Sequence, residues 1–149
     1  MISFELLGEP VGWQRTGVRI VKPKFGKQFA TLYTPAETRA YEKALALVAK
    51  VAMAGAGKPA PITGPLRLTV TAFMPVPASW SRKKRDAALA GAIRPTVKPD
   101  WDNIGKMTDA LKGIIWNDDT QVVDGRVVKT YDEHPRLRVE IEVLEGDLL

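Results

Sequence analysis

The sequence contains no cysteine and only one histidine among its 149 residues. It therefore has no disulfide framework and no thiol chemistry. No apolar run approaches the roughly 18 residues of a membrane helix, which excludes a membrane-spanning segment. The N-terminus lacks the basic flank and the apolar run of a signal peptide, so we expect a protein that works in the cytoplasm. Internal repeats and a glycine loop that could cradle phosphates are also missing.

The charge and the length of the chain indicate what kind of protein it is. The formal net charge is +5, which is the sign expected of a protein that binds a polyanion. The composition is balanced rather than biased, which argues against disorder. A chain of this length can bury a real core, so we expect residues 1–149 to form a single domain.

The hydrophobic patterns predict strands and helices in a mixed order. The predicted strands cover residues 2–7, 18–21, 28–33, 66–74, 121–129 and 136–144, and the predicted helices cover residues 35–53, 82–90 and 103–112. Thr34 at the N-cap, Pro35 at the first helical position and Glu37 mark the start of the long helix. This order predicts an α+β fold, with a mixed, mainly antiparallel sheet packed by helices.

The segment of residues 98–129 gathers several acids and a lysine around one predicted helix. Asp102 suits the N-cap of this helix, and Ile104, Met107 and Leu111 form its buried stripe. Lys106 follows Asp102 by four residues, so the two side chains share one side of the helix. Asp100 precedes the helix on an extended step. Two carboxylates and an ammonium group are therefore expected to converge.

A turn at Asn117, Asp118 and Asp119 precedes the strand of residues 121–129, and it can return Asp118 or Asp119 toward the helix start. Three carboxylates form a set of hard oxygen ligands that suits Mg²⁺ or Mn²⁺ rather than zinc. Each acid also has a simpler interpretation. Asp102 alone is an ordinary N-cap, and Asp118 and Asp119 alone are turn residues.

Basic residues precede the acids along the chain. A solvated helix face is the usual interpretation of such a run, but next to a metal site we favour contact with a nucleic-acid backbone. Trp13 is interpreted as a packed aromatic side chain. The candidates for phosphate contact are Arg15, Arg82, Lys83, Lys84, Arg85 and Lys98.

The combination of these motifs resembles the RusA family of Holliday junction resolvases, which are small nucleases of bacteria and their prophages. The family hallmark is a D-L-D-N segment, a nearby lysine and a later D-D-x-Q-V. Here they read Asp100-Trp101-Asp102-Asn103, Lys106 and Asp118-Asp119-Thr120-Gln121-Val122. Trp101 replaces the usual leucine. The resemblance also includes Gly8-Glu9-Pro10, Tyr33-Thr34-Pro35 and the segment from Ser79 to Arg85, and so extends over nearly the whole chain.

The resemblance implies an activity and a set of site residues. It implies an endodeoxyribonuclease that resolves four-way DNA junctions by paired symmetric nicks and depends on Mg²⁺, with Mn²⁺ as a possible substitute. Asp100, Asp102 and Asp119 would hold the metal, and Lys106 would be the essential lysine. Symmetric nicking implies a homodimer. Two alternatives stay open: a nuclease that acts on flaps, forks or RNA, and a structure-selective DNA-binding protein.

Overall fold

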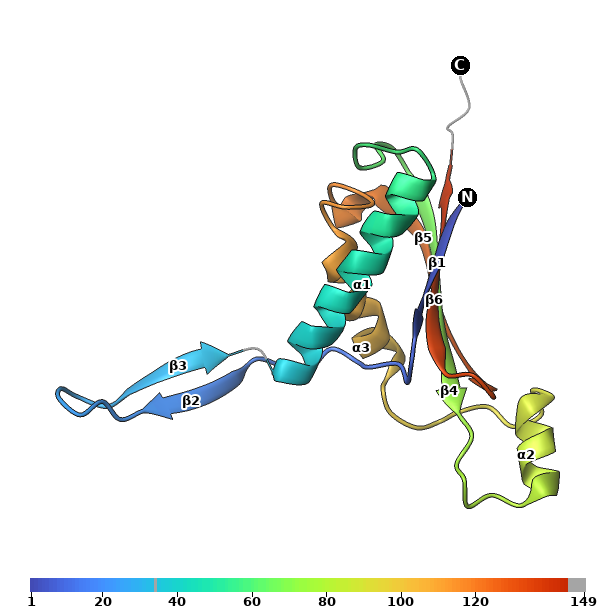
Figure 1. Ribbon diagram of the computed structural model, residues 1–149, viewed down its shortest axis with the longest axis horizontal. Helices are drawn as coiled ribbons and strands as arrows, with labels where there is room; N and C mark the ends of the chain where they lie inside the picture. The colour runs from blue at the N-terminus through green and yellow to red at the C-terminus, as the bar shows by residue number, and fades with distance from the viewer. Residues whose placement is uncertain (34, 145–149) are drawn as a thin grey trace.

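The computed structural model describes residues 1–33 and 35–144, and its centre is a four-stranded sheet (Figure 1). The strands run in the order β1 (Ile2–Leu7), β6 (Arg136–Val143), β4 (Leu66–Pro75) and β5 (Val122–Asp132). The β1–β6 and β6–β4 pairs are antiparallel, and the β4–β5 pair is parallel. The predicted mixed, mainly antiparallel sheet is confirmed.

Strand β4 lies inside the sheet and shows why its sequence forms a strand. Alternate side chains of a strand point to opposite faces, and one set here is wholly apolar. That set is buried and consists of Leu66, Leu68, Val70, Ala72 and Met74. The other set is less buried, and the strand ends at Pro75.

Helix α1 (Ala36–Gly55) covers one face of the sheet (Figure 1). Its core side carries Thr38, Leu45, Ala49 and Met53, all of which are buried. The helix begins one residue later than predicted, because Pro35 occupies the N-cap position and Ala36 is the first helical residue. Thr34, the predicted cap, lies outside the described residues.

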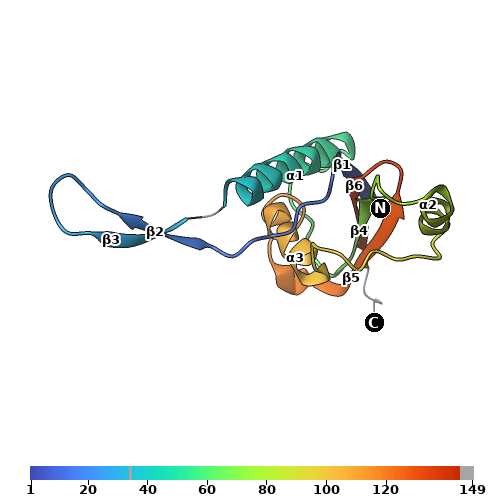
Figure 2. The same cartoon turned by 90° about the horizontal axis from the view of Figure 1, so that it is seen from below.

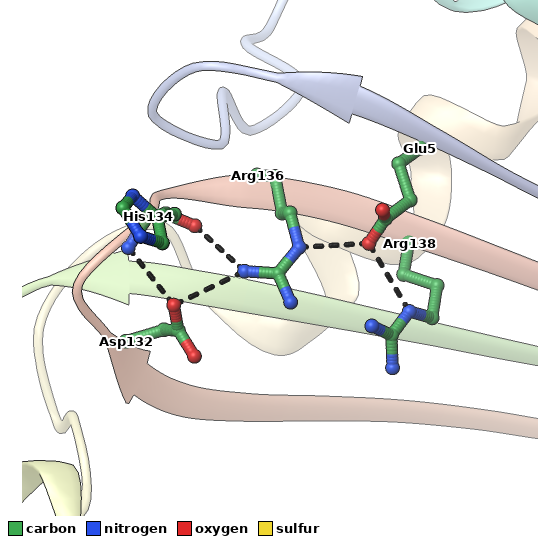
Figure 3. A network of polar contacts seen from close by, with 5 residues as sticks. All are labelled: Glu5, Asp132, His134, Arg136 and Arg138. Carbon is green, nitrogen blue, oxygen red and sulfur yellow. Dashed lines mark hydrogen bonds and ion pairs between the residues drawn. The ribbon is translucent and has the colours of Figure 1, made fainter.

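The opposite face of the sheet carries a network of ion pairs (Figure 3). The Arg136 guanidinium bonds Glu5 Oε2 at 2.7 Å and Asp132 Oδ1 at 3.1 Å, and it lies 3.8 Å from the centre of the Phe73 ring. Arg138 also bonds Glu5, at 3.2 Å. These contacts connect residues of β1, β4, β5 and β6 across the sheet.

Two smaller elements extend from the body of the molecule in opposite directions (Figures 1 and 2). Strands β2 (Gly17–Val21) and β3 (Phe29–Tyr33) form a separate two-stranded hairpin, which we call the arm. Helix α2 (Arg82–Leu89) lies at the other end and contacts β5. Ser81 caps α2, because its Oγ accepts a hydrogen bond from the Lys84 backbone N–H at 3.2 Å. Within the described residues, no helix has the length and the apolar character needed to cross a membrane.

Candidate active site

The acid-rich segment forms a shorter α-helix than the sequence predicted. Helix α3 (Trp101–Lys106) is followed by a 3₁₀-helix, η1 (Met107–Leu111). The prediction of an N-cap at Asp102 is wrong: Asp100 occupies the cap, without a side-chain capping bond, and Asp102 lies in the first turn. The chain tightens at η1, where Thr108 and Leu111, three residues apart, both turn inward.

The core fixes the position of α3 and leaves its charged side exposed. Ile104, Met107 and Leu111 are almost completely buried, which confirms the predicted stripe. Asp102 and Lys106 point the other way, and both side chains are about half exposed. Lys106 Nζ lies 3.8 Å from Asp102 Oδ2, so the predicted pairing of these residues is confirmed.

Asp100 and Asp102 share a shallow cleft of about 430 Å³. Lys129 of β5 also lines the cleft, and its Nζ donates a hydrogen bond to the Val97 carbonyl oxygen. Trp101 forms a further part of the wall and is 69% exposed. The structure therefore brings two of the three predicted metal ligands together, beside a lysine that the sequence analysis did not single out.

The loop of residues 8–16 closes against the start of α3. The Trp13 backbone N–H donates to the Asn103 carbonyl oxygen at 2.8 Å, and Lys106 Nζ lies 5.1 Å from the centre of the Trp13 ring. Gly12 permits this approach, since a Cβ there would sit 2.5 Å from Pro99 Cβ. Trp13 is a partly buried, packed aromatic residue, as predicted.

A second cleft, of about 410 Å³, lies between this loop and α3. Lys98, predicted to contact phosphate, lines it together with Asp100 and Asn103. Glu9 and Glu37 line the same cleft. Asp100 therefore stands between two concave surfaces, one of which contains a predicted phosphate-binding side chain.

Asp118 and Asp119 have different surroundings, although they are neighbours in the sequence. Asp118 caps a short 3₁₀-helix, η2 (Asp119–Gln121), through its Oδ1, which accepts from the Thr120 N–H at 3.0 Å. This backbone bond lowers the pKa of Asp118. Asp119 Oδ1 instead accepts from the indole N–H of Trp116 at 2.9 Å. Asp118 thus stabilises the local turn, while the buried Trp116 ring orients the Asp119 carboxylate.

The sequence analysis did not identify Asp109, which is electrostatically coupled to Asp119. Burial raises the pKa of Asp109, the Asp119 carboxylate raises it further, and Lys112 opposes the shift. The spacing contained a signal: Asp109 follows Lys106 by three residues and Asp102 by seven, so all three fall on one side of a helix.

The arrangement of the acids can be tested against the needs of a metal ion. Carboxylate oxygens are the donors that Mg²⁺ and Mn²⁺ prefer, so the residue types fit. Across residues 1–33 and 35–144, however, no three His, Cys, Asp or Glu side chains form a group that could hold an ion. Asp119 is also absent from the residues that line the cleft of Asp100 and Asp102.

The predicted DNA-contacting residues lie on both sides of α3. Arg82, Lys83 and Lys84 are exposed on α2, and Lys84 Nζ lies 4.0 Å from the centre of the Trp80 ring. Arg85 is half-buried on the same helix. Arg15 is exposed just before β2. The arm lies on the other side of α3 from α2 (Figure 2). Basic groups therefore flank the acids but do not surround them.

Comparisons with known proteins identify the family of the chain. The family model for Endodeoxyribonuclease RusA matches residues 8–142. The chain is also 39% identical over 144 residues to the uncharacterized protein YqaN of Bacillus subtilis (strain 168), and the match covers 94% of each chain. The matched region contains every predicted site residue, from Arg15 to Asp119. The chain therefore belongs to the RusA family of endodeoxyribonucleases.

Proposed function

We propose that this protein is a Mg²⁺-dependent endodeoxyribonuclease that resolves four-way DNA junctions by paired symmetric nicks during recombination and repair. The observation that carries the proposal is the placement of Asp100, Asp102 and Lys106 on the exposed side of α3, between two basic elements. Membership of the RusA family supports the same activity. We further propose that residues 1–149 act as one endonuclease domain in the cytoplasm.

The acids supply the chemistry of a hard divalent ion. In this proposal Asp100, Asp102 and Asp119 would hold Mg²⁺, and Mn²⁺ could replace it. A metal ion bound by carboxylates orients water and stabilises charge on phosphoryl oxygens. The Trp116 indole N–H fixes one oxygen of Asp119 and so presets the direction of that carboxylate.

Lys106 acts either on the phosphate or on the attacking water. Its side chain is about half exposed, and its ammonium group lies between the Asp102 carboxylate and the Trp13 ring. A positive charge at this position offsets the negative charge that develops on a phosphate oxygen, or it positions the attacking water. Either role requires the ammonium group, not only the length of the side chain.

The basic residues bind the DNA backbone. Phosphate contacts orient a protein on nucleic acid without reading its sequence. We assign this role to Lys98 in the second cleft, to Arg15 beside the arm, and to the α2 residues Arg82, Lys83, Lys84 and Arg85. Contacts on both sides of α3 would hold a branched substrate across the acids.

Paired nicks need two active sites related by a two-fold axis, so we propose a homodimer. A two-fold dimer presents the same acids to two opposing strands of a junction. The two nicks then fall at symmetric positions.

Nick mapping on an immobile four-way junction tests the proposal. The purified protein is incubated with the junction, with matched linear duplex and with single strand, each with and without Mg²⁺. We expect metal-dependent nicks at symmetric positions in two opposing strands of the junction alone. Equal cutting of all substrates would reduce the function to a general nuclease, and cutting confined to flaps, forks or RNA would reassign the substrate. Junction binding without nicks under Mg²⁺ and Mn²⁺ would indicate a DNA-binding protein.

A further inference from the structure

One face of the arm consists only of apolar side chains. Residues that pair directly across two antiparallel strands lie on the same face. The pairs Val18 with Leu32 and Ile20 with Ala30 therefore form one continuous patch. Val18, Ile20 and Leu32 are 62%, 58% and 71% exposed. We call these four residues the aliphatic face of the arm.

Exposure of the aliphatic face to water is unfavourable. An isolated two-stranded hairpin is at best marginally stable, because it has no second layer on which to bury apolar side chains. The arm points away from the sheet and from α1 in both views (Figures 1 and 2), and its exposed fractions show that no described residue covers the patch. A partner that covers the aliphatic face would stabilise the arm.

Helix α1 has an apolar stripe of its own on the side away from the core. Ala40, Ala44, Leu47 and Val51 recur at intervals of four, three and four residues, which places them along one side of the helix. Leu47 and Val51 are 62% and 65% exposed. A helix that packs on a sheet with one side needs no apolar residues on its other side. We therefore expect a partner to bury this stripe as well.

The stripe continues into a shallow groove of about 310 Å³ beside β1. The groove is lined by the apolar residues Leu6, Leu7, Val11, Ala40 and Ala44, and also by Glu37 and Tyr41. Leu7 is 78% exposed. The outer apolar surface therefore runs from the end of β1 along α1 to Val51. We call Leu7, Ala40, Ala44, Leu47 and Val51 the α1 stripe.

We propose that two copies of this chain exchange arms, so that the aliphatic face of each arm packs on the α1 stripe of the other copy. Both surfaces belong to the same sequence, and the arm of one molecule points away from its own stripe. Association with a second copy covers both surfaces at once, and two-fold symmetry makes the contact twice. This contact gives the homodimer of the proposed function its interface, and it rests on that function only for the need for two sites.

The chemistry of the aliphatic face favours protein over DNA as its occupant. DNA presents phosphates and base edges, and single strands are held by aromatic side chains and cations. The aliphatic face offers neither. The arm region does carry cations, namely Arg15, Arg19, Lys22, Lys24 and Lys27, with no acid between residues 10 and 36. None of these cations belongs to the aliphatic face, so the arm can contact a partner subunit with that face and DNA with the others.

Molecular mass in the absence of DNA is the first test. The wild-type chain should sediment at twice its mass of 16.4 kDa and dissociate on dilution. Ile20→Asp and Leu47→Asp each place a charge in the contact twice per dimer, and each should raise the dissociation constant about 100-fold or more. Thr31→Asp, on the other face of the arm, and Arg39→Asp, on the polar side of α1, are the matched controls and should leave it within about threefold. All four positions are exposed, so thermal unfolding should show folded protein.

Engineered cysteines then identify which surfaces meet, since the natural chain contains none. A mild oxidant applied to Ile20→Cys mixed with Leu47→Cys should give a covalent dimer that contains one of each. Neither variant alone should form a disulfide dimer to a comparable extent.

Several outcomes would overturn the proposal. A wild-type chain that stays monomeric at all concentrations would overturn it. A dimer that Ile20→Asp and Leu47→Asp both leave intact would overturn it as well. Efficient crosslinking of Ile20→Cys alone would show arm-to-arm packing instead. Loss of junction binding by Ile20→Asp with an unchanged mass would show that the face docks on DNA. Since mass and crosslinking are measured without DNA, failure of the nick-mapping experiment would leave this contact standing, and the reverse also holds.

Discussion

The indole N–H of Trp116 donates to Asp119 Oδ1 at 2.9 Å, across a single turn of the chain. Trp116 is 1% exposed, so the core holds its ring in place. Asp119 is thereby joined to the hydrophobic core through one hydrogen bond. A carboxylate held in this way has less orientational freedom to lose when it binds a ligand.

Trp116→Phe should separate this positioning role from catalysis itself. The change removes the indole donor and leaves an aromatic ring in the core. We expect the free energy of unfolding to fall by about 1 to 3 kcal/mol. Junction cleavage should fall about 10- to 100-fold, with more Mg²⁺ needed for half-maximal rate. Trp80→Phe, in a half-buried ring against Tyr131, is the control and should keep the wild-type Mg²⁺ dependence. An unchanged Mg²⁺ dependence in Trp116→Phe would remove the positioning role.

Asp119→Asn and Asp118→Asn form a pair that distinguishes the two adjacent acids. In Asp119→Asn the new amide oxygen can still accept from Trp116, so the fold should persist while the carboxylate is lost. We expect cleavage to be abolished and junction binding to survive or tighten, because repulsion from phosphate falls. Asn is as good a cap as Asp, so Asp118→Asn should keep cleavage within a few-fold of wild type. Nicking assays and gel-shift titrations on the same junction give both readouts. Equal loss of activity in both variants would undermine the assignment of Asp119 alone.

Lys106→Met tests whether the ammonium group is needed. Methionine keeps an apolar stem beside the Trp13 ring but carries no charge. The lost ion pair with Asp102 is half exposed and contributes only about 0.2 to 0.5 kcal/mol to stability, so unfolding should change little. Cleavage should fall about 100-fold or more, because phosphate charge is no longer offset. Lys112→Met, at the end of η1, is the control. Near-normal cleavage by Lys106→Met would show that the ammonium group of Lys106 is not needed for cleavage.

The spacing of apolar residues along the sequence predicted the strands and helices that bury one side in the core. The alternation of residues 66–74 identified the start and the core face of β4, which ends one residue later than predicted, at Pro75. A strand with one buried side must repeat every two residues. The stripe of Ile104, Met107 and Leu111 was identified for the same reason at helical spacing. The pairing of Asp102 with Lys106 followed from that spacing alone.

Features that depend on distant contacts were not predictable in this way. The parallel pairing of β4 with β5 joins segments about fifty residues apart, and no local signal specifies it. The helix start was misplaced because Asp102 suits a cap equally well in isolation, whereas the chain places Asp100 there. Lys129 reaches the cleft only because β5 passes beside α3. The choice of Asp119 over Asp118 came from the family resemblance and stays a prediction.

Gly12→Ala tests the contact between the N-terminal loop and α3. The new Cβ would lie 2.5 Å from Pro99 Cβ and 3.3 Å from Asn103 Cβ, so the loop or the helix start must shift. We expect a loss of about 1 to 3 kcal/mol in unfolding free energy, as for other overpacked contacts, and slower cleavage, because Asp100 adjoins the contact. Gly55→Ala, at the end of α1 with open space around it, is the control and should be neutral or slightly stabilising. Wild-type stability and cleavage in Gly12→Ala would show that the loop can shift to accommodate the new Cβ without loss of stability or activity.

Glu5→Gln tests the ion-pair network on the outer face of the sheet. Hydrogen bonds from Arg136, and then from Arg138, lower the pKa of Glu5 below its ordinary value of 4.5, while desolvation opposes them. A carboxyl group with a lowered pKa in the folded state stabilises the fold at pH values above its unfolded pKa. That contribution is lost as pH falls below about 4.5 and through the folded pKa.

Glu5→Gln should therefore be less stable than wild type at neutral pH, and the difference should shrink toward zero in acid. Urea unfolding at a series of pH values measures it, and high salt should reduce it, because the side chain of Glu5 is 38% exposed. Glu133→Gln, at an exposed position in the turn before β6, is the control for the loss of one carboxylate and should change the stability at neutral pH by no more than about 0.5 kcal/mol. A difference that stays constant from neutral pH into acid would mean that Glu5 stabilises the sheet by packing and not through its charge.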